Sequence, residues 1–430
     1  MLWSAAASAE GSAWFRTGPY LQRPAPGTVE IRWEGRRARD AEVRLEGRED
    51  VRRVKAAPRQ AIRLDDLEPG ERYGYEVRTD DAVARGEIRT APPPEGTISF
   101  AVMGNTRSDA RVQALLAASL RTEDPDFLLG TGNLVSDGLS AHEWTRFFDL
   151  GREVLASAPI FPAIGTNDRQ GERRSADHFD GFFSLPGEPG DESVSRHYAF
   201  SYGPARIVVL DSTTDAAGIE AQTSWLENEL SEARADEAAR HIFVATHHAP
   251  LSVGLGGGDE RVRNAWMPLF EEFEVDAVFS GHDHAYARAE SGGVRYFVTG
   301  GGGAPLYSRS SDPDEKSAET TAHFESVHHY LRVDVAAGLA QVTARRLDGT
   351  LIESVRWGEN EPPGPDLAAA MDRFSEPPPA GAPPADDLAV TDESEVPKGP
   401  LRLEFLGLAL AVVGGGVFAW SLRRGGATAP

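Results

Sequence analysis

Apolar and polar residues follow two different patterns along this chain, and the pattern changes near residue 91. Before that point they alternate with a period of two, for example in residues 29–33, 41–45 and 73–77. Alternation of this kind is typical of strands with one buried face. We therefore expect residues 17–91 to form a small antiparallel β-sandwich, followed by the proline-rich linker of residues 91–96.

Within this first region, residues 67–73 read LEPGERY. The segment resembles the tyrosine corner of fibronectin type III-like domains, in which a phenol binds nearby backbone. The resemblance implies a structural role for Tyr73. Nothing in residues 17–91 indicates catalytic chemistry.

From Ile98 onward, short apolar runs alternate with helical segments. This order is typical of an α/β domain in which mixed sheets are flanked by helices. We expect that domain to occupy residues 97–357. The expected strands are residues 98–103, 127–129, 160–164, 206–210, 242–245, 277–279 and 296–298, and the expected helices are residues 110–120, 143–154, 222–235 and 265–273.

Two segments near the end of the chain have a different character. Residues 358–400 contain ten prolines and ten acidic residues against two basic ones, a composition that favours an extended stalk. Residues 405–422 are uncharged and mostly apolar. As a helix they would be about 27 Å long and could cross a bilayer. The alternative is a buried helix, but the glycines at 414–416 would weaken a soluble one.

The charges around this apolar segment indicate an orientation. Arg423 and Arg424 follow it directly, and the positive-inside rule places them in the cytoplasm. We therefore expect a membrane-anchored protein with the bulk of the chain extracytoplasmic. This orientation needs an export signal, and we interpret residues 1–16 as the remnant of one, with a small-residue cleavage site at residues 7–9.

The composition excludes several classes of partner and site. The chain has 44 basic and 67 acidic residues, which give a net charge of −23. Nucleic acid is therefore not expected as a partner, because its phosphates would be repelled. The chain contains no cysteine, which excludes disulfide frameworks, thiolate metal sites and cysteine nucleophiles.

Five of the expected strands end in loops that are rich in glycine and polar residues. Loops at the carboxyl ends of strands in an open α/β sheet converge, so we expect one shared site. The spacing of His247, His282 and His284 is that of imidazoles that converge on a metal ion. The loops are GNTR at 104–107, GNLVSDG at 132–138, GTND at 165–168, HHAP at 247–250 and GHDH at 281–284.

These ordered motifs, together with YFVTGGGGAPLY at residues 296–307, resemble the calcineurin-like metallophosphoesterases. The resemblance is strongest to the purple acid phosphatase-like branch with an N-terminal fibronectin type III-like domain, and it covers roughly residues 18–357. It implies a hydrolase of phosphoric esters with two metal ions, such as zinc, iron or manganese, bridged by an aspartate. A water or hydroxide on these ions would attack the ester.

At the metal positions the chain departs from the family pattern. Asn105 stands in place of a ligand aspartate, and Asn133 stands in place of the bridging aspartate. Thr166 replaces a ligand asparagine, and Asn167 replaces the histidine that contacts the phosphate. The family ligands that are retained are His247, His282 and His284.

The two missing carboxylates matter because two divalent cations close together repel strongly. An asparagine carbonyl can bind a hard cation but does not neutralise it. We therefore expect at most one divalent ion, held by the three histidines. Two functions stay open: a catalytically impaired relative that binds a phosphate-bearing ligand, and an active phosphatase or phosphodiesterase with a single or dinuclear metal centre.

Further residues are candidates for binding a phosphate group or a metal ion. Arg107 and Arg169 are candidates for phosphate binding, because a guanidinium matches phosphate oxygens; the alternative is that both point to solvent. His328 and His329 are expected at a strand start near the rim of the site, where they could act as ligands. A third function is a scaffold whose N-terminal domain contacts an unknown protein partner.

Overall fold

The protein is described by a computed structural model over residues 14–169, 176–186 and 196–358. The expected stalk, the apolar segment at 405–422 and almost all of the expected signal remnant lie outside these ranges. Within them, no helix combines the length and the apolar character needed to cross a membrane.

The first region is an antiparallel sheet with the order β1-β2-β4-β5, in which β3 also pairs with β2. The period-two alternation of the sequence is confirmed, since alternate side chains of β2 are buried. Tyr73 accepts the backbone N–H of Glu68 at 2.8 Å, as expected for a tyrosine corner. The strands form one hydrogen-bonded sheet, and the fibronectin type III-like assignment stays a prediction. The bounds are β1 Phe15–Ala25, β2 Thr28–Leu45, β3 Val51–Leu64, β4 Arg72–Arg78 and β5 Val83–Arg89.

This sheet is joined to the α/β region by buried hydrogen bonds. The Tyr20 hydroxyl donates to the carbonyl of Phe182 at 2.7 Å. The Tyr75 hydroxyl donates to the carbonyl of Ala156 at 3.0 Å. The linker at residues 91–96 therefore separates two patterns of strands, but buried contacts continue across it.

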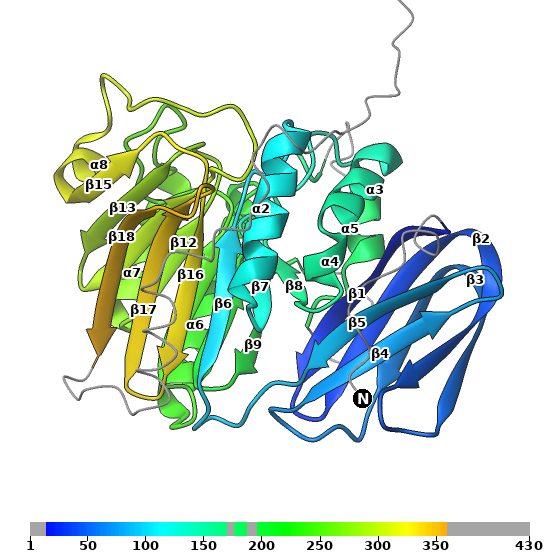
Figure 1. Cartoon of the computed structure of the whole chain (residues 1–430). Helices are drawn as coiled ribbons and strands as arrows, with labels where there is room; N and C mark the ends of the chain where they lie inside the picture. The colour runs from blue at the N-terminus through cyan, green and yellow to red at the C-terminus, as the bar shows by residue number, and fades with distance from the viewer. Residues whose placement is uncertain (1–13, 170–175, 187–195, 359–430) are drawn as a thin grey trace, which may run out of the picture. The chain divides into compact units, whose positions relative to one another are not determined.

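The α/β region contains two sheets, drawn in Figure 1. The first has the order β18-β17-β16-β6-β7-β8, and the second has the order β15-β13-β14-β12-β11-β10-β9. The bounds in the first sheet are β6 Ile98–Met103, β7 Phe127–Gly130, β8 Ile160–Pro162, β16 His329–Ala336, β17 Leu339–Arg346 and β18 Leu351–Gly358. In the second sheet they are β9 Tyr198–Tyr202, β10 Ala205–Val209, β11 His241–Thr246, β12 Ala277–Ser280, β13 Tyr286–Ser291, β14 Val294–Thr299 and β15 Thr321–Glu325.

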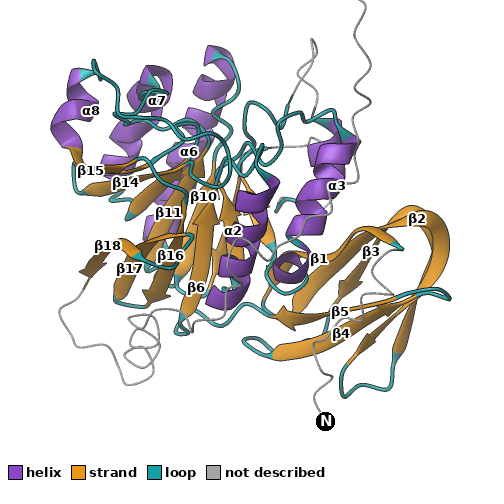
Figure 2. Ribbon diagram, turned by 45° about the horizontal axis from the view of Figure 1, so that its top comes forward, coloured by secondary structure: helices purple, strands orange, loops and turns teal. Residues whose placement is uncertain are grey.

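The two sheets face each other across a shared core, and helices cover their outer faces (Figure 2). Along β6, Phe100 and Val102 enter the core between the sheets, while Ala101 and Met103 face the helices. Side chains of β11 divide in the same way between the shared core and the outer cluster with α6 and α7. The helix bounds are α2 Ala110–Glu123, α3 Ala141–Leu150, α4 Arg152–Leu155, α5 Asp177–Phe182, α6 Ala216–Ala235, α7 Glu260–Glu272 and α8 Glu315–Thr320.

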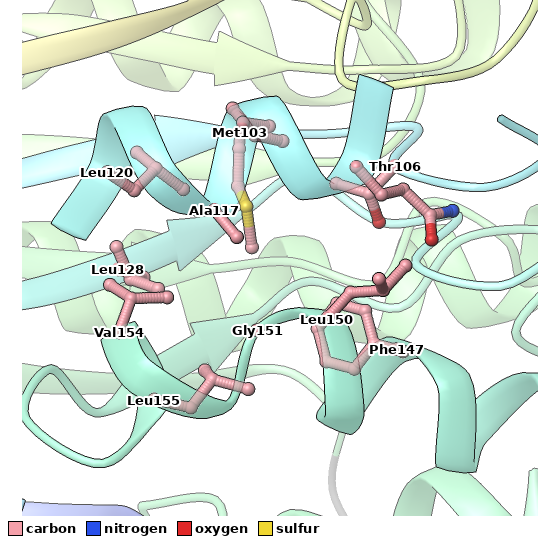
Figure 3. Close-up of a pocket in the computed structure, with 12 residues that line it drawn as sticks. Met103, Thr106, Ala117, Leu120, Leu128, Phe147, Leu150, Gly151, Val154 and Leu155 are labelled. Atoms are coloured by element: carbon pink, nitrogen blue, oxygen red, sulfur yellow. The ribbon is translucent and has the colours of Figure 1, made fainter. Parts of the chain in front are cut away.

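A small apolar cavity lies beneath α2, where the side chains of Met103, Leu120 and Phe147 line it (Figure 3). Its volume is about 30 Å³, which has room for little more than a water molecule. We therefore regard this cavity as a packing feature of the core.

Candidate metal centre

The five loops predicted to share a site do meet. The backbone N–H of Asn105 donates to the carbonyl of Gly132 at 2.9 Å, which joins the loops after β6 and β7. The N–H of Gly281 donates to the carbonyl of His247 at 3.0 Å, which joins the loops after β12 and β11. Thr166, in the loop after β8, lies 3.5 Å from Nε2 of His248. The carboxyl ends of strands from both sheets therefore enclose one site.

Three residues of this site adopt the left-handed backbone conformation. Their φ angles are 53° at Asn105, 54° at Asn133 and 64° at His282. Positive φ is uncommon outside glycine, although Asn and His tolerate it better than most residues. Such conformations concentrate at functional sites, where the surrounding contacts hold them in place.

A cluster of three histidines can hold a metal ion. One ring nitrogen from each of His247, His248 and His282 lies within 4.8 Å of the other two. Sequence analysis predicted His247 and His282 correctly as neighbours but did not select His248. The adjacent histidines of the HHAP motif were the available signal.

Hydrogen bonds fix which ring nitrogen of His247 and of His248 is free to bind a metal ion. Nδ1 of His247 lies 2.8 Å from the carbonyl of Thr131, and Nδ1 of His248 lies 3.1 Å from the carbonyl of Ser212. A carbonyl can only accept, so both Nδ1 atoms carry the proton and Nε2 keeps its lone pair. Nε2 of His247 is buried and has no hydrogen-bond partner among the described residues. Metal-binding histidines are held by second hydrogen bonds of this type.

The surroundings of the cluster favour the neutral form of its histidines. Burial lowers the pKa of His247 well below its usual value, and the neighbouring histidines lower it further. Burial and the charge of His282 lower the pKa of His248 to about 4. Burial also lowers the pKa of His282. Neutral imidazoles are the form that binds a metal ion, so this set fits one divalent ion.

His284 lies outside the cluster, although sequence analysis grouped it with the metal ligands. Its Nδ1 donates to the carbonyl of Pro305 at 2.7 Å, and its ring stacks on Tyr307 with the centroids 4.1 Å apart. Its Nε2 lies 3.4 Å from NH2 of Arg107. Both ring nitrogens therefore have partners, and His284 is not part of the group of three histidines.

The two asparagines at the carboxylate positions hold the loops together. Oδ1 of Asn105 accepts the backbone N–H of His282 at 2.9 Å. Oδ1 of Asn133 accepts the backbone N–H of Asn167 at 2.7 Å, and Nδ2 of Asn167 donates to the carbonyl of Ser136 at 2.9 Å. These amides bring no negative charge to the site.

Asp168, the acidic residue of the GTND motif, is fully buried. Its carboxylate accepts the N–H groups of Gly165 at 2.9 Å and Leu134 at 2.8 Å. Burial raises its pKa to about 7, while these hydrogen bonds act in the opposite direction. Asp168 thus organises the loops after β7 and β8 from within and does not face the histidines.

Beside the cluster lies an open cavity of about 450 Å³, and His248 forms part of its wall together with Thr166, Arg169 and Arg261. Arg169 bonds Asp211 at 3.3 Å and Thr213 at 2.9 Å. Asp211 and Thr213 therefore hold the guanidinium of Arg169, a candidate for phosphate binding, against the wall of the cavity.

The remaining histidine candidates are tied to backbone elsewhere. Nδ1 of His328 donates to the carbonyl of Gly301, and Nδ1 of His329 donates to the carbonyl of Val327. His329 begins β16, as expected. Neither joins the three-histidine cluster.

Known proteins share this architecture. Residues 103–286 match the family of calcineurin-like phosphoesterases. The phosphoenolpyruvate phosphatase of Allium cepa is 25% identical over 262 residues, which covers 58% of this chain and 54% of that protein. The chain spans about half the length of the curated relatives it matches.

Solved structures agree on the fold. A purple acid phosphatase from yellow lupin (Lupinus luteus) superposes with a TM-score of 0.66 at 15% identity, over 80% of this chain and 74% of that one. GAP50, the anchor in the inner membrane complex of Plasmodium, superposes with a TM-score of 0.51 at 20% identity, over 66% of this chain and 95% of that one. Residues 103–286 are thus similar to calcineurin-like phosphoesterases, and the fold of the chain is similar to that of a purple acid phosphatase.

Proposed function

We propose that this protein binds a phosphate-bearing ligand at a single divalent metal ion and hydrolyses phosphoesters weakly or not at all. One observation carries the proposal. The residues at the two carboxylate positions are Asn105 and Asn133, and each uses its side-chain oxygen to accept a backbone N–H from a neighbouring loop.

Electrostatics limits such a site to one ion. Unit charges about 4 Å apart interact by roughly 4 kcal/mol at an effective dielectric constant of 20, so two dications would repel by about 16 kcal/mol. Carboxylates between the ions would offset this repulsion, and the amides of Asn105 and Asn133 do not. A single ion on His247, His248 and His282 meets no such repulsion.

The site also lacks a residue that could donate a proton to the leaving group. A metal ion bound at the histidine cluster would polarise a phosphate oxygen and acidify a water molecule. The leaving group would still need a proton from a positioned acid. Asn167 occupies the position of the phosphate-contacting histidine, its amide does not titrate, and its Nδ2 already donates to Ser136. The chain therefore lacks an acid at this place.

The test is elemental analysis of the purified full chain, combined with an assay on p-nitrophenyl phosphate. We expect one equivalent of zinc, iron or manganese and turnover close to that of a His282→Ala variant, which should lose the metal. Two equivalents with turnover typical of phosphatases would overturn the proposal and support the alternative of an active dinuclear enzyme. One equivalent with such turnover would support the single-metal enzyme.

The single-metal enzyme is the second candidate because of the open cavity beside His248. Its volume of about 450 Å³ could hold the organic part of a phosphoester next to the metal. The hydroxyls of Thr166, Thr213 and Thr214 on its wall could bind that group.

For localisation we propose a membrane anchor at residues 405–422, with the metallophosphoesterase domain outside the cytoplasm. The support is the uncharged apolar composition of this segment and the two arginines that follow it.

A further inference from the structure

We propose that the guanidinium of Arg107 takes the place of the second metal ion, so that the site clamps a phosphate group between one metal ion and one arginine. This inference rests on the single-metal site proposed above. In this proposal the second ion is absent. The positive charge that it would supply comes from Arg107, in the loop after β6.

The first support is the contact between Arg107 and His284. NH2 of Arg107 lies 3.4 Å from Nε2 of His284. Nδ1 of His284 donates its proton to Pro305, so Nε2 holds a lone pair and accepts from the guanidinium. The histidine that the family resemblance assigned to a metal ion is therefore bound to a cation of the chain itself.

The second support is that the charge of Arg107 is not neutralised. Across residues 14–169, 176–186 and 196–358, no acidic side chain forms an ion pair with it. Its Nε is buried and has no hydrogen-bond partner within those same residues. The two arginines beside the nearby cavity differ, because Arg169 pairs with Asp211 and Arg261 pairs with Asp259. A partly buried guanidinium without an acidic partner favours an anion.

The third support is that the two histidines of the GHDH loop have different partners. Two residues apart, His282 faces the histidine cluster and His284 faces Arg107. The carboxylate of Asp283, between them, is turned the other way, since it accepts from Ser252 and from the N–H of Gly256 at 3.2 Å. The loop therefore contributes one histidine to the metal-binding cluster and a second histidine to the contact with Arg107.

The chemistry indicates phosphate as the ligand. A guanidinium donates two parallel hydrogen bonds to two oxygens of a phosphate group and leaves other oxygens for a metal ion. An arginine in place of the second metal ion also lowers the electrostatic repulsion between the two positive charges of the site. The product of charges for a dication and an arginine is half that for two dications at the same distance. Asn105 can then be neutral, because a second dication no longer needs its carboxylate.

The experiment is a calorimetric titration of the full chain with inorganic phosphate, in metal-free form and with one equivalent of Zn²⁺. Arg107→Gln should weaken phosphate binding roughly tenfold or more in both forms, because a charge-assisted hydrogen bond is lost. Arg107→Lys, which keeps the charge but not the fork, should recover part of the affinity. Arg111→Gln removes the same charge from an exposed position four residues away and should bind like the wild type.

Metal stoichiometry, measured on the same samples, keeps this inference separate from the proposed function. Arg107→Gln should still bind one equivalent through the histidines. If its phosphate affinity equals that of the wild type, the inference is wrong whatever the metal count. If the wild type binds two equivalents, the proposed single-metal site fails, and the place assigned to Arg107 fails with it.

Discussion

The side-chain oxygen of Asn133 accepts the backbone N–H of Asn167 at 2.7 Å. These two residues stand where the family resemblance calls for a bridging carboxylate and a phosphate-contacting histidine. Their contact shows that the altered positions are integrated into the loops after β7 and β8. An aspartate at position 133 could accept the same N–H, so the loop geometry alone does not require an amide.

We predict that restoring the family residues will rebuild the second metal site only if Arg107 is also removed. The variant with Asn105→Asp, Asn133→Asp, Thr166→Asn and Asn167→His should still bind one ion, because the guanidinium at His284 repels a second one. Adding Arg107→Ala should raise the stoichiometry to two and give measurable hydrolysis of aryl phosphates. Elemental analysis and the phosphatase assay check this.

Asn133→Asp alone serves as the control for this series. It should raise metal affinity without producing activity, because the acid at position 167 is still missing. A four-position variant that binds two ions with Arg107 present would contradict the prediction.

The histidine cluster predicts a ligand set that differs from the one expected from the sequence. His248→Ala should weaken Zn²⁺ binding at least about tenfold, since it removes one of three ligands. His284→Ala should leave Zn²⁺ affinity within about twofold, because both nitrogens of that ring already have partners. Competition with a chromogenic chelator measures both affinities. The reverse order of effects would restore the set His247, His282 and His284.

The sequence predicted where the site lies better than which side chains face it. The motifs after β6, β7 and β8 follow parallel strands of one sheet, and those after β11 and β12 follow parallel strands of the other, so each group ends at one edge of its sheet. The direction of His284 could not be predicted, since it is set by Pro305 and Tyr307, about twenty residues later in the chain.

The extent of β16 shows a similar limit, because the sequence predicted a strand start at His328 and His329 but not the strand that follows. β16 is almost wholly buried but contains Arg332 and Asp334, charges that interrupt an apolar run. The structure pairs them with each other, and Arg332 also bonds Glu123 of α2. Only this tertiary pairing makes the strand compatible with burial. The expected helix at residues 143–154 is divided at Gly151, whose N–H bonds back to Phe147 and ends α3.

A buried histidine outside the metal cluster predicts how stability depends on pH. Burial lowers the pKa of His329 to about 4, from an ordinary value of 6.5. Between these values the unfolded chain binds more protons than the folded one, so this contribution to stability is present above pH 6.5 and is lost as the pH falls toward 4. In His329→Gln, the slope of unfolding free energy against pH should be shallower by about 1 kcal/mol per pH unit, below the limit of about 1.4 for one whole proton.

Denaturant titrations of metal-free protein between about pH 4.5 and 6 measure this slope. Other groups titrate in the same range, but they are common to both proteins and cancel in the difference. His142→Gln, which removes an exposed histidine, serves as the control for the substitution itself. Equal slopes for His329→Gln and the wild type would show that the buried ring does not differ from the unfolded chain in proton binding.

The proposed anchor predicts a difference in partitioning. Full-length protein should enter the detergent phase of a Triton X-114 extraction, and a variant that ends at Pro400 should stay in the aqueous phase. The reason is the transfer of the apolar segment at 405–422 out of water. Equal partitioning of the two proteins into the aqueous phase would refute the anchor.

The contact between Tyr20 and Phe182 predicts that the N-terminal sheet and the α/β region unfold together. Tyr20 is buried, and its hydroxyl donates to the carbonyl of Phe182 at 2.7 Å. Tyr20→Phe leaves that carbonyl without its donor, so it should cost about 1–3 kcal/mol. The loss should appear as a shift of one cooperative transition, followed by both circular dichroism and tryptophan fluorescence. Tyr73→Phe is the control, since its hydrogen bond to Glu68 lies within the sheet and is exposed. Two separate transitions in Tyr20→Phe would instead show that the sheet folds independently of the α/β region, and unchanged stability would show that this hydrogen bond does not couple them.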